Sequence, residues 1–386
     1  MLLENNPYPR DVRVRAEAET LVRAGYTVEV VAPRASGQAG RERCDGVDVR
    51  RFRTRDGSAH GSGGLVVEYV LATIALNWAA LRALSRGATI LHLHNPPDTL
   101  FPAAAAFRLA GRLVVFDHHD LTPETIEAKF GAGGFSRLAR MCERLTFALA
   151  HHVVATNDSY AAIACGRGGK SLTDVTVVRN APPSAWTGLP LCIRSGELTQ
   201  LRLAYVGSIS SQDGVEGLAP VLAGLLLLDP PLNAVLTVIG DGDARPALEL
   251  EFARHGVADR VTFTGWVEAD RVPALLQQAD VCVDPAPASE VNQRSTMIKI
   301  AEYLALGKPV VAYDLLETRR TAGDAALLVA PGDVHGFTQA IARLAREPQL
   351  RSRLAQDARR RAQALTWDHS ARALLDAYST LTSRPH

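Results

Sequence analysis

The sequence is poor in lysine and in aromatic residues, and it carries little net charge. Only four of its 42 basic residues are lysines, namely Lys129, Lys170, Lys299 and Lys308, so arginine supplies most of the positive charge. The basic residues nearly balance 41 acidic ones, which leaves a formal net charge of +1. This balance argues against a nucleic-acid footprint and against an acidic tail.

Cysteine is also scarce. The five cysteines are scattered, odd in number and never spaced as C-x-x-C. That pattern favours a reducing compartment and argues against a zinc site. We therefore expect a cytoplasmic protein with no metal and no cofactor. We also expect no secretory signal, because Met1-Leu-Leu is followed directly by Glu4-Asn-Asn-Pro.

Long apolar runs are rare, and one stretch, residues 65–84, approaches the length of a membrane span. Glu68, Asn77 and Arg82 interrupt it, which disfavours a span. A buried or surface-docking helix is the preferred interpretation. A docking helix on an arginine-rich first domain would suit peripheral contact with the inner face of an anionic membrane.

What the chain does contain is an alternation of short β-branched runs with amphipathic helical patterns, which is typical of parallel α/β architecture. At 386 residues, with 47% apolar content, the chain is long enough for about two domains. Predicted strands of the first block cover residues 27–32, 47–52, 90–94, 113–117 and 152–155. Those of the second block cover residues 201–207, 234–239, 261–264, 281–284, 309–313 and 325–329.

Composition also suggests where the domains divide. Residues 180–197 are rich in Pro, Gly and Ser and read as a linker. We predict a first domain over 1–185, a second over 198–365 and a final helix over 366–386. We expect the first strand to be shortened, because residues typical of a helix start come within a dozen residues of Met1. Two doubly wound domains are expected to face a central cleft, with ligands beyond the carboxyl ends of the strands.

The most informative segment runs from Arg294 through Ser295, Thr296 and Lys299 to Glu302. Residues three apart on a helix share a face, and a helix start offers unpaired amide groups to anions. A cation, a carboxylate and a helix N-terminus suit a ligand with phosphates at one end and hydroxyls at the other. A nucleotide sugar is such a ligand. The alternative is a solvated helix face with ordinary charges.

Two strand ends of the second block add small residues and a tryptophan. Gly207 and Ser208 follow the strand 201–207, where backbone amides can approach phosphates closely. Gly265, Trp266 and Val267 follow the strand 261–264. Trp266 either lies beside a nucleobase or packs at the mouth of its loop.

Strand ends of the first block carry titratable side chains. His119 and Asp120 follow the strand 113–117, and Asn95 follows the strand 90–94. We expect His119 to face the cleft, with Asp120 as its neighbour or as a helix cap. Asn95 or Asp98 is expected to hydrogen-bond hydroxyls. His92 is interpreted as a buried histidine of a core or interface.

Taken together, these segments resemble the family-four retaining glycosyltransferases of the GT-B fold, nearly from end to end. Each motif is weak alone, but their order and spacing are specific. The segments that carry the resemblance are Pro9-Arg-Asp-Val-Arg-Val, Asp117-His-His-Asp120, Tyr205-Val-Gly207, Val238-Ile-Gly-Asp-Gly242, Phe263-Thr-Gly265, Glu302-Tyr-Leu-Ala-Leu-Gly-Lys-Pro-Val310 and the closing Thr366-Trp-Asp helix.

The resemblance implies a role for each motif. Glu302 would hold the donor ribose, and His119 would lie near the transferred sugar; with Lys299 they form the expected catalytic set. The donor-binding set it implies is Gly207, Ser208, Gly265, Trp266, Val267, Arg294, Ser295, Thr296, Lys299 and Glu302. On the acceptor side it implies Arg10, Asp11, Asn95 and Asp120. Such enzymes keep the anomeric configuration without a metal, by stabilising charge on the departing phosphate.

Two departures from the family pattern concern the phosphates. The family usually has Arg directly after the glycine of the Tyr205 strand and Lys six places past that glycine. This chain has Ser208 and Asp213 there. Our hypothesis is that Lys299 and Arg294 supply the missing positive charge.

The sequence therefore predicts a hexosyltransferase (EC 2.4) that moves a sugar from a nucleoside-diphosphate sugar to a hydroxyl acceptor. UDP is the expected base because it is common in the family. The product would belong to polysaccharide, glycolipid or secondary-metabolite biosynthesis, and a lipid-linked acceptor is one option. Two alternatives remain: a non-catalytic nucleotide-sugar-binding subunit or degenerate homologue, and a nucleotide-sugar epimerase on the same fold.

Overall fold

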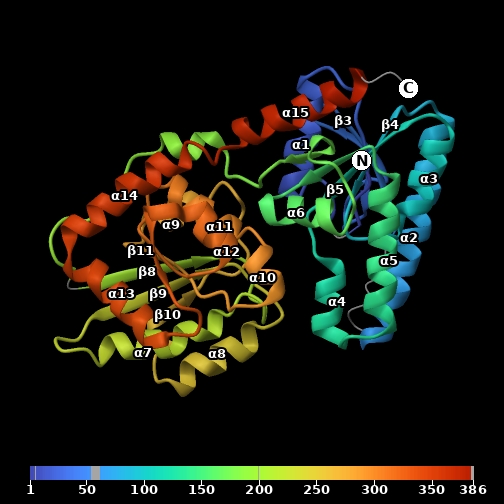
Figure 1. The fold of residues 1–386 in the computed structure, drawn as a ribbon. Coiled ribbons are helices and arrows are strands. Elements are labelled where there is room, and N and C mark those ends of the chain that lie inside the picture. The colour runs from blue at the N-terminus through green and yellow to red at the C-terminus, as the bar shows by residue number, and fades with distance from the viewer. Residues whose placement is uncertain (5, 54–60, 199, 384–386) are drawn as a thin grey trace. The chain divides into compact units, whose positions relative to one another are not determined.

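The chain folds into two compact α/β units, shown as a ribbon in Figure 1. The computed structural model describes residues 1–4, 6–53, 61–198 and 200–383. Unit 1 comprises residues 1–180 and 370–386, and unit 2 comprises residues 181–369. Each unit is built around parallel strands, so the predicted α/β class is confirmed.

Unit 1 contains two sheets joined by the first residues of the chain. The sheet orders are β1-β3-β2 and β4-β5-β6-β7, and β2 runs antiparallel to β3. Leu2 forms parallel bridges to Val31 of β1 and to Leu93 of β4, so it lies between the two sheets. The strands are β1 (Glu29–Pro33), β2 (Arg41–Cys44), β3 (Val47–Phe52), β4 (Ile90–His94), β5 (Leu113–His118), β6 (His152–Ala155) and β7 (Val175–Val177).

Helices of unit 1 bury apolar side chains in its core, among them Phe107 and Phe147. Asp11 caps the first helix, because its Oδ1 accepts a hydrogen bond from the Val14 amide at 2.9 Å. Leu374 and Tyr378 of the last helix are buried in unit 1. The helices are α1 (Val12–Arg23), α2 (Gly61–Ser85), α3 (Phe101–Leu109), α4 (Thr122–Phe130), α5 (Gly134–Leu149), α6 (Asp158–Gly166) and α15 (Trp367–Ser383).

Unit 2 has one parallel sheet whose strand order reverses in the middle. The order is β10-β9-β8-β11-β12-β13, so the chain winds outward in both directions from the β8–β11 pair. In open α/β sheets, ligands bind beyond the carboxyl ends of the strands at such a switch point. The strands are β8 (Gln200–Val206), β9 (Asn233–Ile239), β10 (Val261–Phe263), β11 (Val281–Asp284), β12 (Val310–Tyr313) and β13 (Ala326–Val329).

Helices cover both faces of this sheet and bury two apolar clusters. One cluster lies under α7 and α13, and the other lies under α11 and α14. The helices are α7 (Leu218–Leu226), α8 (Arg245–Arg254), α9 (Val272–Gln277), α10 (Glu290–Arg294), α11 (Ile298–Ala305), α12 (Leu316–Ala322), α13 (Val334–Arg346) and α14 (Pro348–Ala362).

The segment interpreted as a linker is attached to unit 2. Trp186 and Leu189 pack against the cluster under α11. Arg359 donates hydrogen bonds to the carbonyls of Thr187 and Leu189, and Lys308 donates to the carbonyl of Cys192. Residues 181–198 are therefore an ordered edge of unit 2 rather than a free tether.

Candidate functional site

Three glycines meet at the carboxyl ends of β8, β9 and β10. The Gly207 amide donates to the carbonyl of Ile239 at 3.0 Å, and the Gly240 amide donates to the carbonyl of Gly265 at 3.2 Å. A Cβ added to Gly240 would lie 2.0 Å from the Gly207 carbonyl oxygen, and the φ angles of Gly207 and Gly240 are 145° and 135°. Side chains are excluded at this point, so the loops can come close to each other and to a ligand.

Lys299 of α11 lies beside this glycine cluster in a buried charge network. Its Nζ donates to the Tyr205 hydroxyl and to Asp213 Oδ1, both at 2.9 Å, and lies 3.7 Å from Asp284 Oδ1. A Cβ on Gly207 would lie 3.1 Å from Lys299 Cε. Burial lowers the pKa of Lys299, but Asp284, Tyr205 and Asp213 outweigh it and hold that pKa above its usual value. The ammonium therefore stays charged.

The carboxylates of Asp213 and Asp284 limit how strongly the Lys299 ammonium can attract a ligand. Asp284 is the last residue of β11 and is buried, and burial raises its pKa. Asp213 is the more accessible partner, with its side chain 18% exposed. Lys299 is therefore already balanced within the protein. A diphosphate at this point has to displace Asp213 or share Lys299 with it.

Glu302 lies one helical turn after Lys299 on α11. Burial raises the pKa of the Glu302 carboxyl to about 7, and the Lys299 ammonium opposes that rise. Within the described part of the chain, its carboxylate makes no hydrogen bond or ion pair. A half-buried carboxyl group without a partner is suited to accept hydrogen bonds from ligand hydroxyls.

The other predicted donor-side residues surround α11 and β10. Arg294 ends α10, and its guanidinium pairs with Glu290 at 2.9 Å. Ser295 and Thr296 lie half-buried just before α11. The N-cap of α11 is Met297, whose side chain makes no capping hydrogen bond, and the Ile300 amide donates to the Met297 carbonyl at 3.0 Å.

The loop after β10 presents a tryptophan to solvent. Trp266 is 77% exposed, which excludes a role as a packing residue of the core. Val267, in contrast, packs against the apolar cluster under α11. On the β8 side, Ser208 is exposed, and its carbonyl accepts a hydrogen bond from the Tyr205 hydroxyl at 2.8 Å.

In unit 1, the carboxyl ends of β4 and β5 enclose a buried charge network. The Arg13 guanidinium donates to Asp117 Oδ1 at 2.9 Å and lies 3.1 Å from Glu17 Oε1. Burial raises the pKa of Asp117, but the Arg13 charge and the neighbouring histidines His119, His92 and His94 outweigh it and hold that pKa well below its usual range. His119 is one of these partners, with its Nδ1 3.2 Å from Asp117 Oδ1.

His119 is thereby held in one orientation. Burial lowers the pKa of His119, but the hydrogen bond and charge of Asp117 outweigh this effect and raise it. Asn95 fixes the loop, because its Oδ1 accepts from the amides of His119 at 2.8 Å and Asp120 at 3.2 Å. Asn95 is fully buried and positions the His119 backbone, and its binding of acceptor hydroxyls stays a prediction.

The remaining residues predicted for the acceptor side differ in their surroundings. Asp11 is occupied as the cap of α1, and Arg10 is exposed beside it. Asp120 is half-buried, and burial raises its pKa. His92 is buried, with its Nδ1 2.8 Å from the Tyr378 hydroxyl, so its interpretation as a buried histidine is confirmed.

Sequence reasoning did not bring the residues of this network together. Glu17, His92, His94 and Asp117 bring four possible metal-ligating atoms within 4.8 Å of one another. Arg13 pairs with both carboxylates and so supplies their positive counter-charge. The i, i+4 spacing of Arg13 and Glu17 at a helix start was the available signal.

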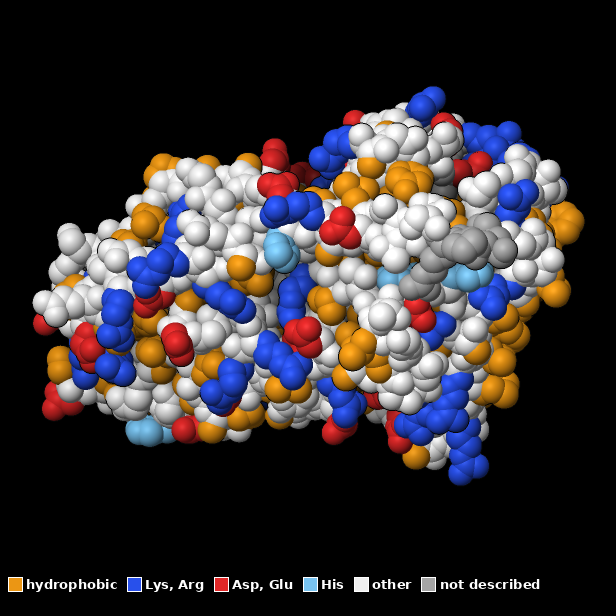
Figure 2. All heavy atoms as spheres, turned by 45° about the horizontal axis from the view of Figure 1, so that its top comes forward, with side chains coloured by type: hydrophobic (Ala, Val, Ile, Leu, Met, Phe, Trp, Pro, Cys, Tyr) orange, Lys and Arg blue, Asp and Glu red, His pale blue; other side chains and the backbone are white. Residues whose placement is uncertain are grey.

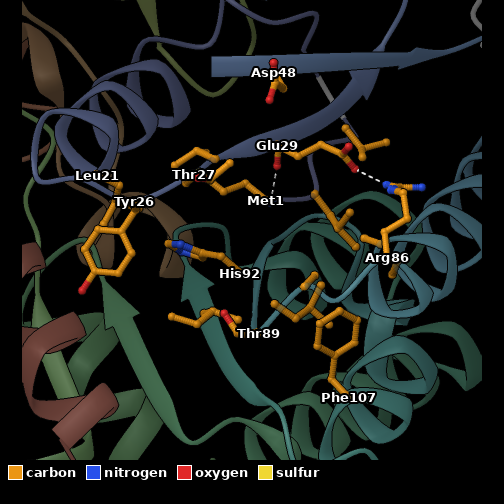
Figure 3. A pocket seen from close by; sticks show the side chains of 18 of the residues that line it. Met1, Leu21, Tyr26, Thr27, Glu29, Asp48, Arg86, Thr89, His92 and Phe107 are labelled. Carbon is orange, nitrogen blue, oxygen red and sulfur yellow. Dashed lines mark hydrogen bonds and ion pairs between the residues drawn. The ribbon is translucent and has the colours of Figure 1, made fainter. Parts of the chain in front are cut away.

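A cavity of about 370 Å³ in unit 1 is lined by residues of both of its sheets (Figure 3). Its lining includes Glu29, Asp48 and Thr89, at or just before the amino ends of their strands. The Met1 amine points into this region and donates to the Glu29 carbonyl at 2.8 Å. Because α/β ligands bind at the carboxyl edge, we assign no ligand to this cavity.

Solved structures of other proteins resemble this chain in fold over nearly its whole length. Sucrose-phosphate synthase from Thermosynechococcus elongatus superposes with a TM-score of 0.73 at 18% identity, covering 99% of this chain and 98% of that one. The Anabaena protein HepE in complex with UDP gives 0.70 at 16% identity, covering 98% and 99%. The predicted GT-B fold is confirmed.

Sequence comparison adds the family. The family described as "Glycosyl transferase 4-like domain" matches residues 11–181, and "Glycosyl transferases group 1" matches residues 200–347. The chain belongs to the group 1, GT4-like glycosyltransferases, as its motifs predicted.

Individual relatives match over shorter stretches. Alpha-D-kanosaminyltransferase of Streptomyces kanamyceticus is 31% identical over 156 residues, 40% of this chain and 39% of that enzyme. D-inositol 3-phosphate glycosyltransferase of Salinispora tropica is 31% identical over 185 residues, 46% and 37% respectively. The chain thus spans less than half the length of these relatives.

Proposed function

We propose that this protein moves a glycosyl group from a UDP-sugar to a hydroxyl acceptor with retention of anomeric configuration. The observation that carries the proposal is the Glu302 carboxyl, which lies half-buried one turn after Lys299 and has no hydrogen-bond or ion-pair partner among the described residues. Family membership supports a nucleotide sugar as the donor. The complexes of HepE with UDP and with UDP-glucose support uridine as the base.

In this proposal Glu302 accepts hydrogen bonds from the ribose hydroxyls, and the amides near Gly207 and Ser208 approach the diphosphate. The bond between the anomeric carbon and the β-phosphate oxygen breaks, and the acceptor oxygen bonds to the same face of that carbon. The acceptor proton passes to the departing diphosphate. Fixed amides and Lys299 stabilise the charge that develops on the leaving oxygen, which is usually the largest single contribution to such catalysis.

The test is a panel of UDP-sugars assayed for transfer and for donor hydrolysis, with thermal shift as the binding readout. Glu302→Gln should weaken UDP binding and abolish the thermal shift, because an amide is a poorer acceptor than a carboxylate. Glu197→Gln, at an exposed position, is the matched control. Unchanged binding and turnover in Glu302→Gln would exclude this role. Activity that persists in EDTA would support the expected metal independence.

A second candidate function is donor binding without transfer. It is favoured by the balance of Lys299 against Asp213 and Asp284, which leaves no excess positive charge at that point. Saturable UDP-sugar binding with no hydrolysis and no transfer to any tested acceptor would support this alternative. Turnover by the purified protein would exclude it.

The acceptor is the open part of the proposal. One relative is named a D-inositol 3-phosphate glycosyltransferase and another a 2-deoxystreptamine glucosyltransferase, and these names point to small hydroxylated acceptors. We propose a hydroxylated acceptor from secondary-metabolite, glycolipid or polysaccharide biosynthesis. Mass spectrometry of products from aminocyclitol, inositol and lipid-linked acceptors distinguishes these classes.

A further inference from the structure

Helix α2 exposes an apolar stripe along its outer face. The stripe follows helical spacing, so its members lie on one side of the helix. Ile74 is 61% exposed and Trp78 is 56% exposed, in a protein whose large apolar side chains are mostly buried. The stripe consists of Val67, Val70, Leu71, Ile74, Trp78 and Leu81.

The opposite face of α2 anchors the helix to unit 1. Leu76 and Ala80 are fully buried in the apolar core of the unit. Residues 67–85 have the length and hydropathy of a membrane span, yet only 17% of that window is buried. Because the inner face is bound to the core, α2 is a docked helix whose outer face is apolar. The prediction of a surface-docking helix thereby gains a structural basis.

A second apolar stripe lies on α5. Its members are Phe135, Leu138, Met141 and Leu145, again at helical spacing, and Phe135 is 68% exposed. Both helices bind the same short turn before α3: the hydroxyls of Thr73 and Thr99 lie 2.6 Å apart, and Thr146 donates to the carbonyl of Asp98 at 3.1 Å. Both stripes lie on helices that contact α3 and the turn before it, and we call the two stripes together the α2–α5 patch.

Arginines border this patch. Arg137 and Arg144 are exposed on α5 next to the stripe, and the Arg82 guanidinium lies 5.0 Å from the centre of the Trp78 ring. Figure 2 shows hydrophobic side chains along the right-hand edge, on the side where Figure 1 places α2, with Lys and Arg side chains at its lower end. Apolar rings and chains beside guanidinium groups are the composition of helices that lie in a membrane interface.

We propose that the α2–α5 patch binds the surface of an anionic lipid bilayer. The stripe on α2 extends roughly 20 Å along a convex helix, which a bilayer accommodates without a complementary groove. The bordering arginines add attraction to anionic headgroups. A second copy of the chain is a poorer occupant, because facing patches would bring Arg82, Arg137 and Arg144 of both copies together.

The test is cosedimentation of the full chain with vesicles. Binding to phosphatidylcholine mixed with phosphatidylglycerol is expected to exceed binding to phosphatidylcholine alone and to fall as salt is raised. Ile74→Ser with Trp78→Ser should reduce vesicle binding roughly tenfold. Leu172→Ser, at an 80% exposed leucine outside the patch, is the matched control and should bind as the wild type does.

A charge variant separates the two contributions. Arg137→Glu with Arg144→Glu should lower binding to anionic vesicles by roughly fivefold or more and leave circular dichroism unchanged. Absence of wild-type binding to anionic vesicles would overturn the proposal. So would equal loss in Leu172→Ser, or a dimer that Ile74→Ser with Trp78→Ser dissociates. Vesicle binding requires no donor, so its outcome is independent of the proposed transferase activity.

Discussion

In the proposed donor site, Asp213 limits the positive charge that Lys299 offers to a ligand. The family pattern places a lysine there, whereas this chain places a carboxylate 2.9 Å from Lys299 Nζ. The exchange removes one positive charge and adds a negative one. A phosphate that approaches Gly207 therefore meets a charged lysine whose charge is already balanced by Asp213.

Removing that carboxylate should strengthen donor binding. Asp213→Asn frees Lys299 for the diphosphate, and we expect the Kd of UDP to fall by about fivefold, or about 1 kcal/mol. Isothermal titration calorimetry measures the change, with Asp259→Asn at an exposed site as the control. Weaker binding in Asp213→Asn would mean that Asp213 holds Lys299 in its binding position.

Glu302 should make donor binding depend on pH. Its pKa is raised to about 7 by burial, so the carboxylate form becomes dominant only above neutral pH. UDP affinity is expected to rise between pH 6 and 8 in the wild type relative to Glu302→Gln, which lacks the titrating group. Parallel pH profiles of the two proteins would contradict this role.

The same shift predicts a pH-dependent stability. A carboxyl group whose pKa is higher in the folded state stabilises the fold below its unfolded pKa, near 4.5, and loses that contribution as pH rises through about 7. Thermal unfolding should therefore show Glu302→Gln gaining stability relative to the wild type between pH 5 and pH 8. A constant difference would contradict the shift.

At the scale of elements, strands with buried apolar runs were predictable. β3, β4, β6 and β11 have the predicted bounds, because period and composition agree there. β2 was missed because Arg41–Cys44 is a mainly exposed edge strand, and β7 has only three residues. Pairings such as Lys299 with Asp213, 86 positions apart, depend on tertiary contacts that local patterns do not encode.

The final helix illustrates such a contact, because Tyr378 of α15 reaches His92 of β4. Tyr378→Phe removes that hydrogen bond and leaves the buried His92 Nδ1 unpaired, so we expect a loss of about 1–2 kcal/mol in the stability of unit 1. Urea unfolding, monitored by the intrinsic fluorescence of unit 1, measures this loss of stability. Tyr26→Phe is the control. The Tyr26 ring meets the Tyr378 ring edge-to-face, with 5.4 Å between the ring centres, and its hydroxyl makes no hydrogen bond among the described residues. Equal losses would contradict a specific role for the bond.

At the scale of the whole chain, arginine side chains connect separate segments by donating hydrogen bonds to backbone carbonyls. Arg351 donates to the carbonyls of Leu344, Arg194 and Gly196, and Arg359 binds two carbonyls near residue 188. A guanidinium has five donors in a fixed plane, so one side chain can hold two segments. Arg351→Lys should lower the melting temperature of unit 2 by a few degrees, whereas Arg353→Lys, on the same helix, should not. Differential scanning calorimetry tests both.

The scarcity of lysine has a practical consequence for chemical labelling. Lys299 and Lys308 are buried in unit 2, and the amine of Met1 is hydrogen-bonded inside unit 1. Lys129 is exposed and Lys170 is half-buried, and both belong to unit 1. Succinimidyl esters should therefore modify the folded protein on one half only, at one or two positions. That gives a fluorophore or surface tether a nearly unique attachment point without any engineered cysteine.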